Sequence, residues 1–342
     1  MKILRAVLAS LALLSGAPAS AQSDTWKALM QEATSLFFQG KFEEGAVPAR
    51  KALELAERER GPQHPMVAAS LNRLAELYRL QGQYAAAEPL YRRSLAIREA
   101  ARGPNSGETA QSLNNLAQLQ SMQGQYAAAE TLFKRALAIR ERTSGDEHTD
   151  VGVTLNGLAE LYREQGRLAE AEPLYRRSLP IWEKALRQSP PPPGTINQIA
   201  FALNGVALVE IRQGRTEEAE TLYKRAIAII DDSRDRDHPL MSRSLQGLAA
   251  LYVREGELDR AEILYKRAVA ILEDSLDRDH PRMAAVLQGL AGVYAARGQN
   301  LAAEALLMRA LDIRVKVLGE GHPDVAVTRD LLAKSRSAKQ EK

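Results

Sequence analysis

The histidines are the residues best suited to metal or acid–base chemistry in this chain, but their spacing opposes it. All five occupy the same place in a repeating pattern, and no two are closer than 42 residues: His64, His148, His238, His280 and His322. In stacked repeats, equivalent residues lie about 10 Å apart, whereas metal–ligand bonds are about 2 Å long. Four of the five precede a proline, which suits the first turn of a helix. We therefore interpret the histidines as helix caps and predict no metal site.

Other catalytic chemistry finds little support in the sequence. The chain has no cysteine, which excludes disulfides, thiolate nucleophiles and cysteine-ligated zinc. The G-x-S-x-G, G-x-x-x-x-G-K and H-E-x-x-H motifs are absent as well. Acidic clusters such as Asp231-Asp232 lie between repeats beside Arg234 and Arg236, whose charges oppose cation binding. We expect a non-enzymatic protein that uses no cofactor.

Side-chain amides recur at one position along the chain and are the first candidates for binding. We call them the amide ladder: Asn72, Asn114, Asn156, Asn204, Gln246 and Gln288. An amide carries both a donor and an acceptor, so it can pair with the peptide groups of an extended ligand whatever the ligand's side chains are. In the alternative interpretation, the amides bridge neighbouring helices and contact no ligand.

Other positions on the same helical strip differ between the two halves of the chain. The N-terminal half carries polar and charged residues: Glu76, Arg79, Gln111, Gln118, Glu160 and Arg163. The C-terminal half is mostly apolar, with Arg243 as its main charge: Phe201, Leu208, Ile211, Val253 and Ala295. The first half would recognise polar side chains, and the second would accept a hydrophobic anchor. Alternatively, Phe201 and Ile211 pack against neighbouring repeats or the inserted loop.

The elements that position these residues belong to a repeat marked by seven glycines: Gly40, Gly82, Gly124, Gly166, Gly214, Gly256 and Gly298. Their spacings are 42, 42, 42, 48, 42 and 42 residues, which is typical of a solenoid. Leu71, Leu74, Ala75 and Tyr78 follow helical spacing before Gly82, and a second apolar stripe follows it. Alanine recurs seven residues before and five residues after these glycines, where two helices must approach closely.

This pattern resembles the tetratricopeptide repeat. The residues that carry the resemblance recur as Leu71-Asn72-Arg73-Leu74-Ala75, Leu113-Asn114-Asn115-Leu116-Ala117 and Leu155-Asn156-Gly157-Leu158-Ala159, with closely similar segments at 203–207, 245–249 and 287–291. The 42-residue period is similar to that of kinesin light chains, here of a bacterial secreted type. The resemblance covers about residues 24–336. It implies an all-α, right-handed α-solenoid of about seven helix-turn-helix repeats plus a C-terminal capping helix, with a peptide-binding groove lined by the first helices.

The 48-residue interval divides the repeats into two groups. We expect repeats 1–4 at 24–188, a proline-rich insertion at 189–195, repeats 5–7 and the capping helix at 196–336, and a polar tail at 337–342. Pro180 is expected to kink or end its helix, and the prolines at 190–193 favour an extended loop. This segment is either a surface insertion in which Trp182 covers an exposed seam, or a stiff joint or docking motif.

Residues 1–21 have the pattern of a secretory signal peptide. Lys2 and Arg5 precede an apolar run at 6–14, and Ala19-Ser20-Ala21 is a small-x-small cleavage pattern. Cleavage after Ala21 would give a periplasmic or secreted protein without membrane insertion; an uncleaved anchor is the alternative. The leader holds two basic and no acidic residues, so the formal charge falls from +3 to +1. That charge argues against nucleic-acid binding.

These features together predict an exported, non-enzymatic scaffold for protein–protein interaction. Its groove is expected to bind a peptide or partner segment through the amide ladder together with Arg79, Arg163, Phe201, Ile211 and Arg243. The alternative is an accessory subunit of a periplasmic enzyme or of a secretion or assembly complex, bound through the convex face. End-to-end self-association is disfavoured by the polar residues at 334–342.

Overall fold

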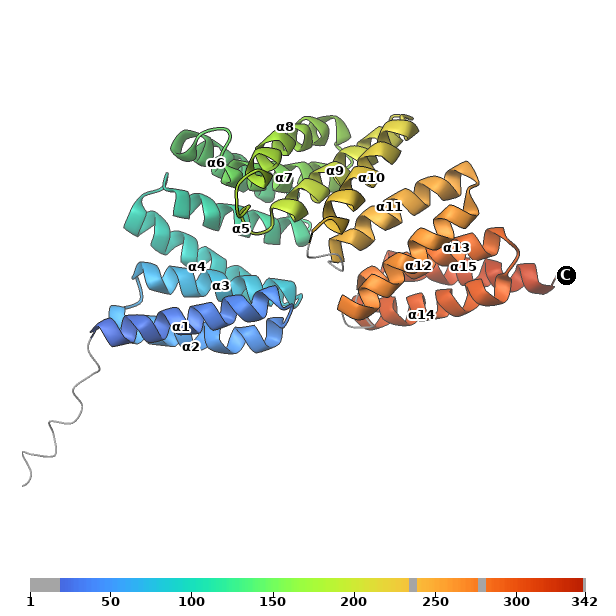
Figure 1. Cartoon of the computed structure of the whole chain (residues 1–342). Coiled ribbons are helices and arrows are strands. Elements are labelled where there is room, and N and C mark those ends of the chain that lie inside the picture. Colours follow the sequence, from blue (N-terminus) through green and yellow to red (C-terminus); the bar gives the residue numbers. More distant parts are fainter. Residues whose placement is uncertain (1–18, 234–238, 276–280, 341–342) are drawn as a thin grey trace, which may run out of the picture. The chain divides into compact units, whose positions relative to one another are not determined.

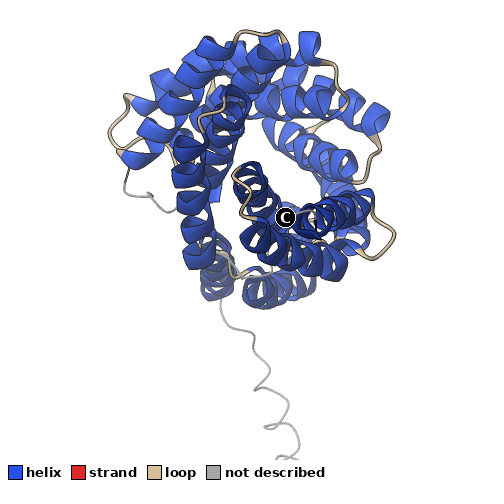
Figure 2. Cartoon of the chain, turned by 90° about the vertical axis from the view of Figure 1, so that its right-hand side faces the viewer, coloured by secondary structure: helices blue, strands red, loops and turns tan. Residues whose placement is uncertain are grey.

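The computed structural model of the chain describes residues 19–233, 239–275 and 281–340. In this part of the chain there are helices and loops but no strand (Figure 2). The helices are α1 (Ala19–Phe38), α2 (Phe42–Arg60), α3 (Pro65–Leu80), α4 (Tyr84–Arg102), α5 (Gly107–Met122), α6 (Tyr126–Ser144), α7 (Thr149–Glu164), α8 (Leu168–Leu186), α9 (Thr195–Arg212), α10 (Thr216–Asp231), α11 (Pro239–Glu255), α12 (Leu258–Ser275), α13 (Pro281–Ala296), α14 (Asn300–Leu318) and α15 (Pro323–Gln340). The predicted all-α solenoid of paired helices is confirmed.

The chain forms two compact units, residues 1–139 and 140–342, and the boundary falls within α6. Successive helices form hairpins, α1/α2 and α3/α4 in the first unit and α7/α8, α9/α10, α11/α12 and α13/α14 in the second, and within a unit these hairpins pack on one another (Figure 1). α15 follows α14 as a single last helix and packs against it. The odd-numbered helices are thus the first helices of the repeats, and the even-numbered helices are the second.

The repeat glycines end the first helices in a backbone conformation that side chains resist. All seven have a positive φ, between 72° and 81°. Because glycine has no Cβ, it adopts this left-handed conformation without strain. The repeated alanines are confirmed as close-contact positions: in each described repeat they are at most 1% exposed, in the first and in the second helix alike.

The histidine caps are confirmed where the structure describes them. Nδ1 of His64, His148 and His322 accepts a hydrogen bond from the backbone N–H two residues later, at 3.1, 3.2 and 3.2 Å. Each bond satisfies a donor that the helix itself leaves unpaired. His238 and His280 lie outside the described residues. Within the described ranges, no cluster of histidine and acidic side chains is arranged to hold a metal ion.

The region around the proline insertion differs from expectation in one respect. Pro180 does not end its helix, because α8 continues to Leu186. Pro180 itself is exposed, while Ile181, Trp182 and Ala185 beyond it are buried and anchor the last turn. Trp182 packs on Gly152 of α7, where an added Cβ would lie 2.7 Å from the indole nitrogen. A division of stability at this insertion stays a prediction.

The remaining expectations concern the signal peptide at the start of the chain, the polar tail at its end and the absence of membrane insertion. Residues 1–18 of the expected signal peptide lie outside the described part, and cleavage stays a prediction. At the other end, α15 extends to Gln340, so most of the expected polar tail is helical. None of the described helices combines the length and hydropathy needed to cross a membrane.

Candidate functional site

The first helices of the second unit enclose a pocket of about 730 Å³. We call it the groove pocket. α7 contributes one lining residue, α10 one, and α9 and α11 the rest: Arg163, Asn204, Leu208, Ile211, Arg212, Tyr223, Arg243, Gln246, Gly247, Ala250, Leu251 and Arg254. Its walls therefore combine aliphatic side chains, amides, one phenol and four arginines.

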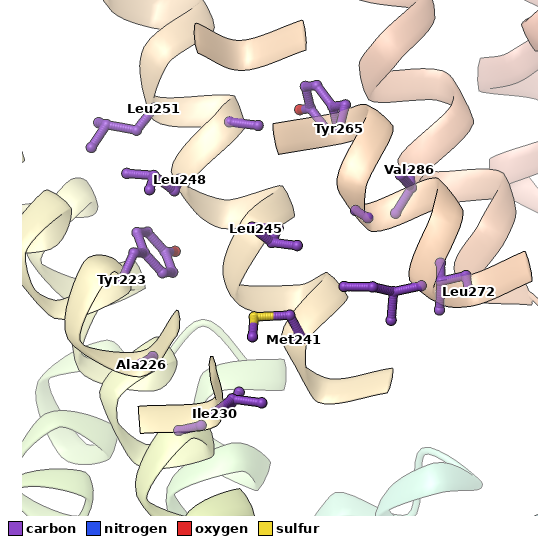
Figure 3. Packing of buried hydrophobic residues seen from close by; sticks show 14 of the residues in the cluster. Tyr223, Ala226, Ile230, Met241, Leu245, Leu248, Leu251, Tyr265, Leu272 and Val286 are labelled. Carbon is purple, nitrogen blue, oxygen red and sulfur yellow. The ribbon is translucent and has the colours of Figure 1, made fainter. Parts of the chain in front are cut away.

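Glycines in the first helices let tyrosines of the second helices reach this face. A Cβ added at Gly247 would lie 2.4 Å from the ring of Tyr223, and one added at Gly205 would lie 2.5 Å from the ring of Tyr175. In Figure 3, the Tyr223 ring lies between its own helix and the helix that carries Leu245 and Leu248. The glycines thus act as notches that admit a ring where any other residue would collide.

One side of the groove pocket is closed by a charged cluster centred on Glu160 of α7. Arg163 donates two hydrogen bonds to the carboxylate, at 2.6 and 2.8 Å, and the Tyr175 hydroxyl donates a third at 2.7 Å. Arg243 of α11 reaches the same carboxylate at 3.1 Å. One carboxylate therefore links α7 to α11, two repeats further along the chain.

The cluster stabilises the ionised form of Glu160. Burial alone would raise the pKa of Glu160, but hydrogen bonds from Arg163 and Tyr175 and the charges of Arg243 and Arg163 lower it to about 2. Burial and the same carboxylate raise the pKa of Tyr175. Two arginines therefore share one negative charge, and their capacity to bind an external anion is partly used inside the protein.

Phe201 of α9 lies beneath this cluster. The Arg243 guanidinium lies 5.1 Å from the centre of the Phe201 ring, and the ring of Tyr175 lies 6.1 Å from it. Phe201 thus packs against residues of the neighbouring repeats, as in the second interpretation considered from the sequence. The ring also holds Arg243 over α9 by a cation–π contact.

Two further arginines of the groove pocket are not neutralised in this way. Arg212 and Arg254 are exposed in the last turns of α9 and α11. Neither makes an ion pair with a described residue, and none of the lining residues is acidic. The rim of the groove pocket therefore carries a net positive charge.

The amide ladder is largely engaged within the protein. Asn156 is 2% exposed; its Nδ2 donates to Gln198 Oε1 at 2.8 Å, and its Oδ1 accepts from Ser178 at 2.5 Å. Asn72 accepts from Asn115 at 2.9 Å, whereas Asn114 is 2% exposed and its Oδ1 has no partner among the described residues. These contacts favour the interpretation that ladder amides bridge neighbouring helices. Ligand contact by these residues stays a prediction.

The other ladder residues vary. Asn204 donates to Ser244 at 2.9 Å, but its buried Oδ1 has no partner among the described residues. Gln288 accepts from Arg314. Gln246 is half-buried, lines the groove pocket, and makes no side-chain hydrogen bond within the described part of the chain. Asn204 and Gln246 are thus the two ladder amides with free capacity at this pocket.

The structure brings together six of the eleven residues predicted from the sequence. Arg163, Asn204, Ile211, Arg243 and Gln246 line the groove pocket, and Phe201 lies beside Arg243. The other five are elsewhere: Asn72, Asn114 and Arg79 in the first unit, Asn156 in the helix packing and Gln288 beside Arg314. Arg79 donates to the sulfur of Met122 at 3.6 Å.

Sequence reasoning missed Tyr223, Arg212 and Arg254. Tyr223 lies in the apolar stripe of its second helix, whose residues are expected to pack in the core. The sequence around it does not show that its ring packs against Gly247 of the next first helix. The two arginines had a detectable signal, because the equivalent positions in the other five repeats are Phe38, Leu80, Met122, Glu164 and Ala296. Arginine stands at this position in two adjacent repeats and in no other repeat. It is therefore a specific feature of this part of the chain and not a requirement of the repeat fold.

Comparison with known proteins places the chain in a family. The model of the tetratricopeptide repeat matches residues 24–100, 69–142, 108–184, 198–274 and 282–341, and the chain belongs to the tetratricopeptide-repeat family. This fold suggests a scaffold for protein–protein interaction, and such proteins are generally non-enzymatic. No curated protein matches the chain.

Several solved structures are similar. BtubC (BKLC) from P. vanneervenii has 23% identity and a TM-score of 0.53, over 71% of this chain and 93% of that one. The apo form of RapI has 15% identity and a TM-score of 0.60, over 85% and 98%. A putative kinesin light chain of Podosopora anserina with nearly identical TPR-like repeats has 27% identity and a TM-score of 0.47, over 62% and 97%. The first two likenesses concern the fold alone.

Proposed function

We propose that this protein is an exported, non-enzymatic scaffold that binds a peptide or partner segment on the first helices of its second unit. The observation that carries the proposal is the groove pocket, which places unpaired polar groups beside an aliphatic wall. Binding sites for other chains combine apolar anchoring with a few fixed polar groups in this way. Gln246, whose amide has no side-chain hydrogen bond among the described residues, provides such a group.

Export and the mode of binding complete the proposal. The leader at 1–21 supports an extracytoplasmic location, where the partner would be another exported protein. An extended segment fits better than a globular surface, because the pocket lies on a row of first helices and its polar groups occur at equivalent positions of two adjacent repeats.

The alternative is binding through the outer face formed by the second helices. One observation favours it: large apolar side chains are exposed on two successive second helices, Ile263 of α12 at 67% and Leu301, Met308 and Val317 of α14 at 66%, 46% and 46%. Exposed apolar side chains are common on protein surfaces, whereas the groove pocket combines an apolar wall with polar groups that have no side-chain partner among the described residues. The groove pocket therefore remains the better-supported site.

A matched pair of substitutions separates the two faces. Ala250→Trp fills the groove pocket from an exposed position of α11, and Ala228→Trp adds the same bulk at an exposed position of α10 on the outer face. The partner is captured by crosslinking and affinity purification of the secreted protein. We expect Ala250→Trp to lose the partner and Ala228→Trp to keep it. The reverse result would support the outer face and reject the groove.

A further inference from the structure

We propose that the segment bound in the groove pocket is acidic and extended, with two carboxylates three residues apart that pair with Arg212 and Arg254. The inference rests on the proposed function, since it specifies the ligand of that same site. Its basis is the distribution of charge, the repeat geometry and the free polar atoms of the groove pocket.

The charge balance selects these two arginines among the four. Arg163 and Arg243 already share the carboxylate of Glu160, at 2.6 and 3.1 Å. Arg212 and Arg254 have no acidic partner among the described residues, and the lining contributes no negative charge. An incoming carboxylate therefore pairs with Arg212 and Arg254 without first displacing an internal one.

The repeat geometry sets the spacing of the ligand's carboxylates. Arg212 and Arg254 are 42 residues apart, at the same position of adjacent first helices. Packed helices are about 8–10 Å apart. A polyproline II segment rises about 3.1 Å per residue with three residues per turn, so residues i and i+3 face the same side about 9 Å apart. Carboxylates at i and i+3 therefore match the two arginines.

The floor of the groove pocket completes the recognition. Leu208 and Ile211 of α9 and Leu251 of α11 give an apolar surface between the charged rim and the helices. Gln246 is half-buried, lines this surface and has no side-chain hydrogen bond among the described residues, so its amide can pair with a backbone group of the ligand. We therefore expect a short apolar side chain between the two carboxylates.

The test uses fluorescein-labelled peptides on a proline-rich host and the full mature protein. One probe has glutamates at i and i+3 with a leucine between them, a second has them at i and i+2, and a third has glutamines at i and i+3. Binding is measured by fluorescence anisotropy at low salt and at 0.5 M salt. We expect the first probe to bind about three- to tenfold more tightly than the other two, and this advantage to shrink in salt.

Variants assign the effect to the two arginines. Arg212→Gln/Arg254→Gln should remove the advantage of the first probe. The control Arg142→Gln/Arg187→Gln, which removes two exposed charges outside the groove pocket, should keep it. Equal binding of the glutamate and glutamine probes, sensitive to Ala250→Trp, would overturn the acidic ligand and leave the groove function standing. Binding of no probe, or binding insensitive to Ala250→Trp, would overturn both.

Discussion

The first helices α3 and α5 of the first unit and α9 and α11 of the second share one backbone plan but present different faces. On α3, Arg73 pairs with Glu76 at 2.8 Å, and on α5, Asn115 donates to Asn72. At the positions of Arg73 and Asn115, α9 and α11 carry glycine, and at the position of Glu76 they carry Leu208 and Ala250. These polar groups of α3 and α5 pair with one another, whereas Arg212, Gln246 and Arg254 of α9 and α11 line the groove pocket without a side-chain partner among the described residues.

This difference shows that the repeat pattern determines the helical fold, whereas a few positions on the first helices determine whether their surface is filled by internal contacts or lines a pocket. A tyrosine admitted by a glycine notch and an arginine without a carboxylate create the groove pocket. An internal ion pair or an amide bridge at the same positions fills the corresponding face. Substitutions at these positions test the comparison.

The largest effect is expected from closing a notch. Gly247→Ala would place a Cβ 2.4 Å from the Tyr223 ring and force the ring or the helix to move. We expect a loss of about 2–4 kcal/mol in the free energy of unfolding, measured by urea denaturation, because overpacking strains a tight interface. In the control Gly292→Ala, nothing lies within 4 Å of the added Cβ. That variant should gain about 0.5–1 kcal/mol from helix propensity. Destabilisation of both variants alike would refute the notch.

The Glu160 cluster should give the second unit a pH-dependent stability. The pKa of Glu160 is about 2 in the folded protein against an ordinary value of 4.5. A lowered pKa means that the ionised form stabilises the fold above pH 4.5 and that this contribution is lost as the pH falls toward 2. The contribution is at most on the order of 3 kcal/mol.

Urea unfolding between pH 5 and pH 2 measures this contribution. The native protein should lose more stability over that range than Glu160→Gln, in which the titrating group is absent. Glu217→Gln, an exposed residue of α10, serves as the control and should follow the native protein. Parallel pH profiles of the native protein and Glu160→Gln would show that the cluster does not titrate in this window.

Substitutions in the amide ladder should have an intermediate effect on stability, which depends on whether the amide is hydrogen-bonded inside the protein. Asn156→Ala removes hydrogen bonds to Gln198 and Ser178 and leaves a space at a buried position, so it should lower the free energy of unfolding by about 1–3 kcal/mol. Gln246→Ala breaks no hydrogen bond within the described residues, so it should change stability by less than about 0.5 kcal/mol and weaken partner binding instead. Thermal denaturation and the peptide assay give the two quantities. A stable Asn156→Ala that loses binding would restore Asn156 as a ligand contact.

The smallest effect is expected where the two units are alike. Arginines of second helices pair with acids of the preceding second helix in both units, as Arg93 with Glu57 at 2.6 Å and Arg309 with Glu273 at 2.8 Å. Both pairs are partly exposed to solvent, so Arg93→Gln and Arg309→Gln should each cost less than about 1 kcal/mol and lose most of that effect in high salt. Urea denaturation at two salt concentrations measures this. A large effect in one unit only would show that the shared scaffold is not equivalent in the two.

Much of the fold could be predicted because its determinants are local. Turn glycines with positive φ, alanines at close contacts and histidine caps each act within a few residues, so a 42-residue period displays them directly. The expectation that Pro180 ends its helix was wrong because a contact with other helices overrides the local rule. The rule that proline ends a helix is local, but here burial of Trp182 and Ala185 against other helices holds the last turn.

The sequence by itself determined the repeat, its two helices and its turns, and it predicted which strip of the first helices would face a ligand. Only the tertiary structure decided which residues of that strip are free. Glu160 and Arg243 are 83 residues apart and meet because α7, α9 and α11 stack. Asn156 is hydrogen-bonded to Gln198 and Ser178. Gln246, at the equivalent position, lines the groove pocket and makes no side-chain hydrogen bond within the described residues. A side chain's partners depend on distances between repeats, and the spacing within one repeat does not contain those distances.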